Sequence, residues 1–133
     1  FFFKQKTAYE IKECDWSSDV CSSDLTSGAV NSLTINAQTG TTYTLASSDA
    51  NALVTASNSG AITVTVPPSV FTTGQVITVQ QIAAGQVTFS QGSGVTITST
   101  GATASAPKTR VQYSSCSIIC TASNTFTIIG DIV

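Results

Sequence analysis

Residues 61–68, AITVTVPP, form the clearest strand signal in the chain. Ile62, Val64 and Val66 alternate with two threonines, so the aliphatic side chains share one face and the hydroxyls share the other. β-Branched residues suit a pleated strand because they are stiff at χ1. The two prolines that follow lack a backbone N–H and therefore end the ladder of hydrogen bonds. The pattern predicts a half-buried central strand whose three aliphatic side chains point inward.

The composition around this stretch favours an all-β domain. Threonine, serine, glycine and valine are abundant, histidine is absent, and only 9% of the 133 residues are charged, which suits a neutral β surface better than a helical one. The sequence has no amphipathic run of helical length and no apolar segment long enough to cross a membrane. We expect no membrane insertion.

The opening segment, residues 1–25, differs sharply from the rest and reads FFFKQKTAYEIKECDWSSDVCSSDL. It holds most of the charged residues and the only tryptophan. From Thr26 onward the charged residues are Asp49, Lys108, Arg110 and Asp131, so that part is formally neutral. Such a change in composition indicates that two different sources are joined near Leu25.

The opening string resembles the conceptual translation of short-read sequencing adapters. Residues 4–11 and 15–25 correspond in frame to two fixed adapter strands, separated by a sample index of ordinary length. No continuous apolar core follows the three phenylalanines, so a secretory signal is not supported. Cys14 and Cys21 do not have zinc-ligand spacing. We expect residues 1–25 to be non-native and disordered, and the natural N-terminus to be missing.

The remainder is expected to be a short lead and one module. Residues 26–37 are predicted as a linker or first strand, and residues 38–133 as the module. Short apolar runs recur about every ten residues between glycines and prolines, which predicts about eight short strands. We expect a single compact antiparallel β-sandwich or small barrel, because no repeat of fixed length supports a parallel solenoid.

Turn residues predict which strands are neighbours. The clearest hairpin joins the strand of Val87 and Phe89 to the strand of Ile97 through residues 92–94. A turn at Gly40 is expected to join two earlier short strands.

Alternating apolar residues also predict the structural core. Its members are Ile62, Val64, Val66, Val79, Val87, Phe89, Ile97, Phe126 and Ile128. Val111, Tyr113 and Ile118 are further candidates for burial. Cys116 and Cys120 would lie on one face of one strand about 13 Å apart, too far for a mutual disulfide, and we expect two small buried thiols.

No constellation of residues predicts catalysis. Without histidine there is no ordinary Ser-His triad and no histidine metal site. Asp49 and Asp131 are far apart in sequence, and nothing marks them as paired carboxylates. We expect Asp49 to be a local hydrogen-bonding cap. The chain is therefore not expected to be an enzyme, and no catalytic, cofactor-binding or metal-ligating residue is predicted.

Lys108 and Arg110 are the only two cations from Thr26 onward. Because they are so close in sequence, they could make a weak contact with an anionic glycan or a phosphate, although such a pair is more often a solvated strand end. Two cations are too few to neutralise a nucleic-acid backbone, so we expect no nucleic-acid partner.

An ordered series of motifs resembles a module found in tailed bacteriophages. The series is QTGTTYTL, DANALVT, SNSGAITVTVPP, FTTGQVITVQQIAAGQVTF, GSGVTI, KTRVQYSS and TFTIIGDIV, over about residues 38–133. It resembles the small β-rich C-terminal module of virion proteins, particularly tail-fibre-like and other appended structural proteins. Relatives tend to carry tryptophan near Phe126 and residues other than cysteine at Cys116 and Cys120, and these departures change side-chain volume rather than chemistry. No binding residue carries over.

The resemblance implies a non-enzymatic structural module located in the virion and involved in attachment or assembly. Its implied partners are other virion proteins and further copies of itself, with a trimer favoured, and a host surface glycan is an additional candidate. An alternative is a carbohydrate-binding or adhesive β module of a bacterial surface protein. A third hypothesis is an ice-binding threonine array, which rests on residues 63–65 (TVT) and residues 96–98 (TIT).

Overall fold

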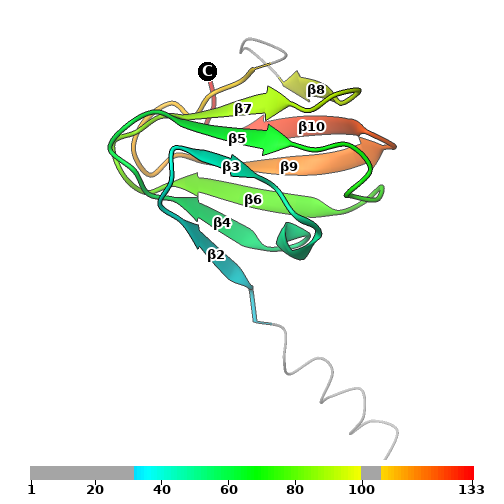
Figure 1. Cartoon of the computed structure of the whole chain (residues 1–133), viewed down its shortest axis with the longest axis horizontal. Helices are drawn as coiled ribbons and strands as arrows, with labels where there is room; N and C mark the ends of the chain where they lie inside the picture. The colour runs from blue at the N-terminus through cyan, green and yellow to red at the C-terminus, as the bar shows by residue number, and fades with distance from the viewer. Residues whose placement is uncertain (1–31, 100–105) are drawn as a thin grey trace, which may run out of the picture. The chain divides into compact units, whose positions relative to one another are not determined.

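The computed structural model describes residues 32–99 and 106–133. Within them, Leu33–Val133 is one compact unit. The segment predicted as non-native, residues 1–25, lies outside the described residues. The described unit is all-β, which confirms the predicted class, and its only helical element is the 3-10 turn η2 (Ser47–Asp49) (Figure 1). No helix in the described ranges has the length and apolar character needed to cross a bilayer.

The strands form two sheets. The larger sheet has the order β2-β4-β6-β9-β10-β8, and the smaller sheet has the order β3-β5-β7. The bounds in the larger sheet are β2 (Ile35–Gln38), β4 (Leu53–Ala56), β6 (Val76–Gln81), β9 (Ser115–Ala122), β10 (Thr125–Gly130) and β8 (Thr96–Ser99). Those in the smaller sheet are β3 (Thr42–Thr44), β5 (Ile62–Val66) and β7 (Val87–Gln91). β2 runs across the boundary predicted at residues 37 and 38.

The strands from β2 to β7 are wound as a solenoid. The chain alternates between the sheets, so that β2, β4 and β6 enter the larger one and β3, β5 and β7 the smaller one (Figure 1). Each strand pairs in parallel with the strand one coil earlier. Leu53 pairs with Ile35 of the previous coil and with Thr78 of the next coil. The chain segment from Leu53 to Thr78 is longer than the segment from Ile35 to Leu53. The stack therefore has regular register but unequal coil lengths.

The predicted antiparallel sandwich or barrel is therefore wrong in its detail. The recurrence of short strands marks half a coil rather than a hairpin. Alternation of apolar and polar residues reports which face of a strand is buried, but it is the same for parallel and antiparallel partners. The unequal coil lengths, which are absorbed in the turns, also hide the repeat that would have indicated a solenoid.

The C-terminal strands end the stack with antiparallel pairs. β9 is antiparallel to β6, with Val79 beside Cys116, and antiparallel to β10, with Phe126 beside Cys120. β10 then pairs in parallel with β8, where Phe126 stands beside Ile97. The turn between β9 and β10 contains Asn124 with a positive φ of 55°, which suits asparagine. β9 and β10 thus form a β-hairpin.

The hairpin predicted between β7 and β8 is not formed. The expected turn is present, since the N–H of Val95 donates to the carbonyl of Gly92 at 3.1 Å and Gly94 has a φ of 75°. After the turn, however, β8 joins the larger sheet while β7 stays in the smaller one. The two strands joined at Gly40, β2 and β3, likewise enter different sheets. Both predicted turns are corners of the solenoid.

The core lies between the two sheets. All nine residues predicted for it are buried, and β5 is the middle strand of its sheet. Phe126 also packs edge-on against Phe71, with ring centroids 6.1 Å apart. Ile118 is buried as expected, but Val111 and Tyr113 are 55% and 65% exposed. They lie in a turn before β9, where Tyr113 has a φ of 69°. The N–H of Tyr113 donates to the carbonyl of Gln81, so the turn is fixed through its backbone while the side chain faces solvent.

Two corners of consecutive coils stack in close contact. The N–H of Gly85 donates to the carbonyl of Asn58 at 2.8 Å. A Cβ at Gly85 would lie 1.9 Å from the carbonyl oxygen of Gly60. Only glycine allows the two backbones to approach this closely.

Candidate functional site

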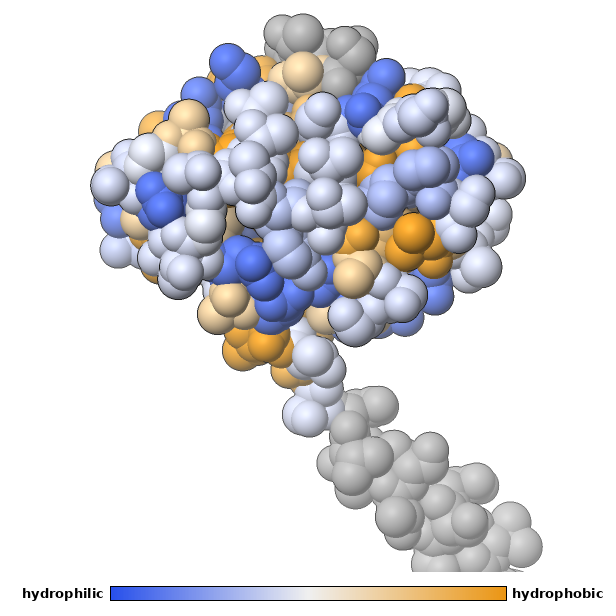
Figure 2. All heavy atoms as spheres, viewed as in Figure 1, coloured by the Kyte–Doolittle hydropathy of each residue, from blue (hydrophilic) through white to orange (hydrophobic). Residues whose placement is uncertain are grey.

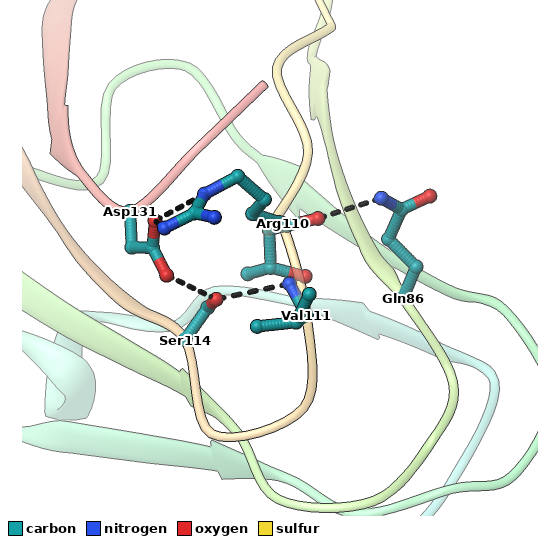
Figure 3. A network of polar contacts seen from close by, with 6 residues as sticks. Gln86, Arg110, Val111, Ser114 and Asp131 are labelled. Atoms are coloured by element: carbon teal, nitrogen blue, oxygen red, sulfur yellow. Dashed lines mark hydrogen bonds and ion pairs between the residues drawn. The ribbon is translucent and has the colours of Figure 1, made fainter.

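The cation pair predicted as an anion contact is part of a polar network (Figure 3). Nε of Arg110 donates to Oδ1 of Asp131 at 2.6 Å, and a second guanidinium nitrogen lies 2.5 Å from the same oxygen. The other carboxylate oxygen accepts from the hydroxyl of Ser114 at 2.6 Å, and that hydroxyl accepts from the N–H of Val111 at 3.0 Å. The hydrogen bonds from Ser114 and Arg110 lower the pKa of Asp131.

This network fastens the C-terminal residues to the turn before β9. The side chain of Lys108 is exposed and takes no part in this network, while its backbone bridges to Thr88 at the edge of β7 and pairs with Val133. Since Arg110 is already paired with Asp131, an anion contact at this position would rest on Lys108 alone. The weak anion contact of Lys108 and Arg110 stays a prediction.

Asp49 is the cap of the 3-10 turn, as expected, and it is only 1% exposed. Oδ2 accepts from the N–H of Ala46 at 2.8 Å and from the hydroxyl of Tyr43 at 2.7 Å, while Oδ1 accepts from the side-chain amide of Asn36 at 2.7 Å. Burial and the adjacent Asp49 carboxylate raise the pKa of Tyr43. Sequence reasoning predicted the local cap but missed the links to β2 and β3, because their residues meet Asp49 only through the coil geometry.

Asp49 and Asp131 have separate sets of partners, so they do not form a carboxylate pair. The described ranges contain no group of three or more side chains that could hold a metal ion. Cys116 and Cys120 both lie on β9 as buried, free thiols. Burial raises the pKa of Cys116 to about 12 and also raises that of Cys120.

The outward face of the smaller sheet carries an ordered set of hydroxyl groups, which we name the threonine ladder. In register across the three strands, Thr42, Thr63 and Thr88 form one column, and the other column consists of Thr44, Thr65 and Ser90. The residue between the two columns on each strand points inward: Tyr43, Val64 and Phe89 stand side by side in register. The core therefore holds each pair of hydroxyl groups from below.

The sequence hypothesis of a threonine array located only part of this ladder. TVT at residues 63–65 is its central row, but TIT at residues 96–98 belongs to β8 in the larger sheet. There Oγ1 of Thr98 lies 3.1 Å from Oγ1 of Thr127, so those hydroxyls satisfy each other. The outer rows, TYT at residues 42–44 and TFS at residues 88–90, were missed because alignment of the rows requires the parallel register.

The hydroxyl groups of the ladder are not occupied by hydrogen bonds within the described unit. Within residues 32–99 and 106–133, none of its six side-chain hydroxyls makes a hydrogen bond to another described residue. None of the described strands contains a charged residue. Figure 2, viewed from the side on which β3, β5 and β7 face the reader, is mostly pale over these strands, which indicates near-neutral hydropathy.

The described residues enclose no pocket. Comparisons of the chain with protein-family models, curated proteins and solved structures found no match.

Proposed function

We propose that this chain is a non-enzymatic structural module of a bacteriophage virion, the C-terminal part of a tail-fibre-like or other appended particle protein that serves attachment or assembly. The motif series over residues 38–133 motivates the proposal. The observation that carries it is the construction of the described unit, two stacked sheets whose strands hold no charged residue. Rigid, neutral surfaces suit a subunit that is packed among other subunits.

The larger sheet supports association with further copies. Its outward face aligns Ile35 with Leu53 across β2 and β4, and Ile129 lies at the other side on β10. Ile35 is 63% exposed and Ile129 is 48% exposed. Exposed aliphatic residues on an uncharged sheet favour burial against a partner. On this proposal, the module is a homo-oligomer, with a trimer favoured, within the virion.

The first test uses residues 26–133, which contain the whole described unit. Sedimentation should give a mass several times that of the monomer, and Ile35→Lys with Ile129→Lys should reduce it. A matched variant in a loop, Ser93→Lys, should leave the mass unchanged. Binding of the same protein to host cells is measured alongside. A strict monomer that does not bind host cells would count heavily against an attachment module.

The second test is genetic. The test reads the nucleotide contig without the adapter bases. We expect native coding sequence in frame before the codon of Thr26, and genes for phage structural proteins as neighbours. Neighbours that encode bacterial cell-surface proteins would instead favour the adhesive module.

A further inference from the structure

We propose that the threonine ladder is a binding surface for ordered water, with an ice crystal as its ligand. This inference is independent of the virion assignment, since it concerns only the outward face of β3, β5 and β7. It rests on the register of the strands, on the side chains that occupy the face and on what the face lacks.

The register gives the ladder two fixed repeats. Neighbouring strands of a sheet lie about 4.8 Å apart, and alternate residues of one strand lie about 6.6 Å apart. The columns Thr42–Thr63–Thr88 and Thr44–Thr65–Ser90 therefore place hydroxyl groups on a two-dimensional grid with these spacings. The spacing between strands is close to the shorter repeat of oxygen atoms on a prism face of hexagonal ice, and the spacing along a strand is somewhat less than the longer repeat.

The five threonine side chains of the ladder suit such a lattice because they are rigid. A threonine in a strand has few χ1 rotamers, so its hydroxyl and methyl groups keep their positions without a large loss of side-chain entropy on binding. Beneath the face, Val64 and Phe89 are almost fully buried and fix the central row on β5 and the outer row on β7. Tyr43 is fixed by its hydrogen bond to Asp49.

The hydroxyls are also available. Thr98 and Thr127 on the larger sheet bond each other, whereas the six ladder hydroxyls have no hydrogen-bond partner among the described residues. A surface water can therefore occupy each site. The methyl groups that the threonines also carry favour an ordered arrangement of this water because they offer it no alternative partner.

Other ligands fit the face less well. Sugars are held by aromatic stacking and by polar groups that converge in a cleft, and the ladder has no aromatic side chain on its outward face and no cleft among the described residues. Lys108, opposite Thr88, borders the ladder as a single cation. We therefore commit to ice rather than to a polysaccharide.

The test measures partition of the full chain, and of residues 26–133, into slowly growing polycrystalline ice, together with inhibition of ice recrystallisation. We expect enrichment in the ice fraction and smaller ice grains. Thr65→Tyr should abolish both effects because its ring prevents flat contact, and the milder Thr63→Val with Thr65→Val should weaken them by removing two hydroxyls while keeping β-branching.

Thr55→Tyr is the matched control, because Thr55 is a half-buried outward threonine in the parallel strand β4 of the other sheet. It should retain the ice enrichment of the unmodified chain. Circular dichroism and thermal melting identify any variant that fails to fold. If Thr65→Tyr does not fold, the ice enrichment of the double valine variant decides whether the proposal holds. Absence of the chain from ice, or equal losses in Thr65→Tyr and Thr55→Tyr, would overturn the proposal. Binding to microcrystalline cellulose that depends on Thr65, without enrichment in ice, would overturn it in favour of a polysaccharide ligand.

Discussion

The hydroxyl of Tyr43 donates to Oδ2 of Asp49 at 2.7 Å, and so joins the smaller sheet to the turn that leads back into the larger one. Asn36 donates to the other carboxylate oxygen from β2. A nearly fully buried carboxylate thus ties the two strands of the first coil to the following corner.

We expect Asp49→Asn to destabilise the fold by about 1–3 kcal/mol, because its amide group cannot accept all the hydrogen bonds that the carboxylate accepts. Tyr43→Phe removes the donor to Asp49 and the acceptor for the side-chain amide of Asn36, and it should cost about 1–2 kcal/mol. Urea denaturation followed by circular dichroism measures both losses. An Asp49→Asn variant as stable as the parent chain would show that the network does not hold the corner.

The low pKa of Asp131 predicts a specific sensitivity to acid. Its folded pKa lies below the unfolded value of about 3.9, so the stability it contributes is present above that pH and is lost as the pH falls through the folded pKa. Asp131→Asn should therefore be less stable than the parent chain at pH 7, with a difference that shrinks toward pH 2. Urea midpoints across this range make the comparison, and a difference that stays constant would contradict a role for the charged carboxylate.

The two cysteines of β9 should resist thiol reagents. Cys116 and Cys120 are buried, and their raised pKa values suppress the reactive thiolate. In residues 26–133, which lack Cys14 and Cys21, we expect negligible reaction with Ellman's reagent at pH 8 and two reacting thiols after denaturation. Reaction of the folded protein at the rate of a small free thiol would contradict the described packing of β9.

Close stacking of the corners predicts that Gly85→Ala is severely destabilising, by more than about 3 kcal/mol, since overpacking here is opposed by backbone rather than by a flexible side chain. Gly94→Ala is the matched control. Nothing lies within 4 Å of a Cβ at Gly94, but its φ of 75° should still cost about 1–2 kcal/mol. Thermal unfolding of both variants shows which one loses more stability. Equal losses of stability would mean that the corners are not in contact.

Burial could be predicted from the sequence because alternation is a local property of a strand. Ile62, Val64 and Val66 are inward for that reason alone. Pairing could not be predicted in this way. Thr63 stands beside Thr88, a full coil further along the chain, and no local signal distinguishes this parallel partner from a nearer antiparallel one.

The same limit applies to polar residues of the interior. Gln81 and Thr109 are buried and hydrogen bonded to each other, although both side chains are normally found at the surface. Their partners come from separate parts of the chain, so the burial of each depends on the fold. The threonine ladder was found only in its central row for the same reason, and only the parallel register of β3, β5 and β7 supplied the other two rows.

The reversal of direction between β6 and β9 gives the stack a stop signal. Parallel strands exchange slanted, evenly spaced hydrogen bonds, whereas an antiparallel strand uses perpendicular bonds in alternating narrow and wide pairs. Once β9 occupies the edge of β6, a further parallel coil has no template there. β8, the next strand of the winding, instead joins the sheet beyond β10. Residues 115–122 therefore end the continuous parallel stack at β6, and a repeat duplicated ahead of β6 would lengthen that stack.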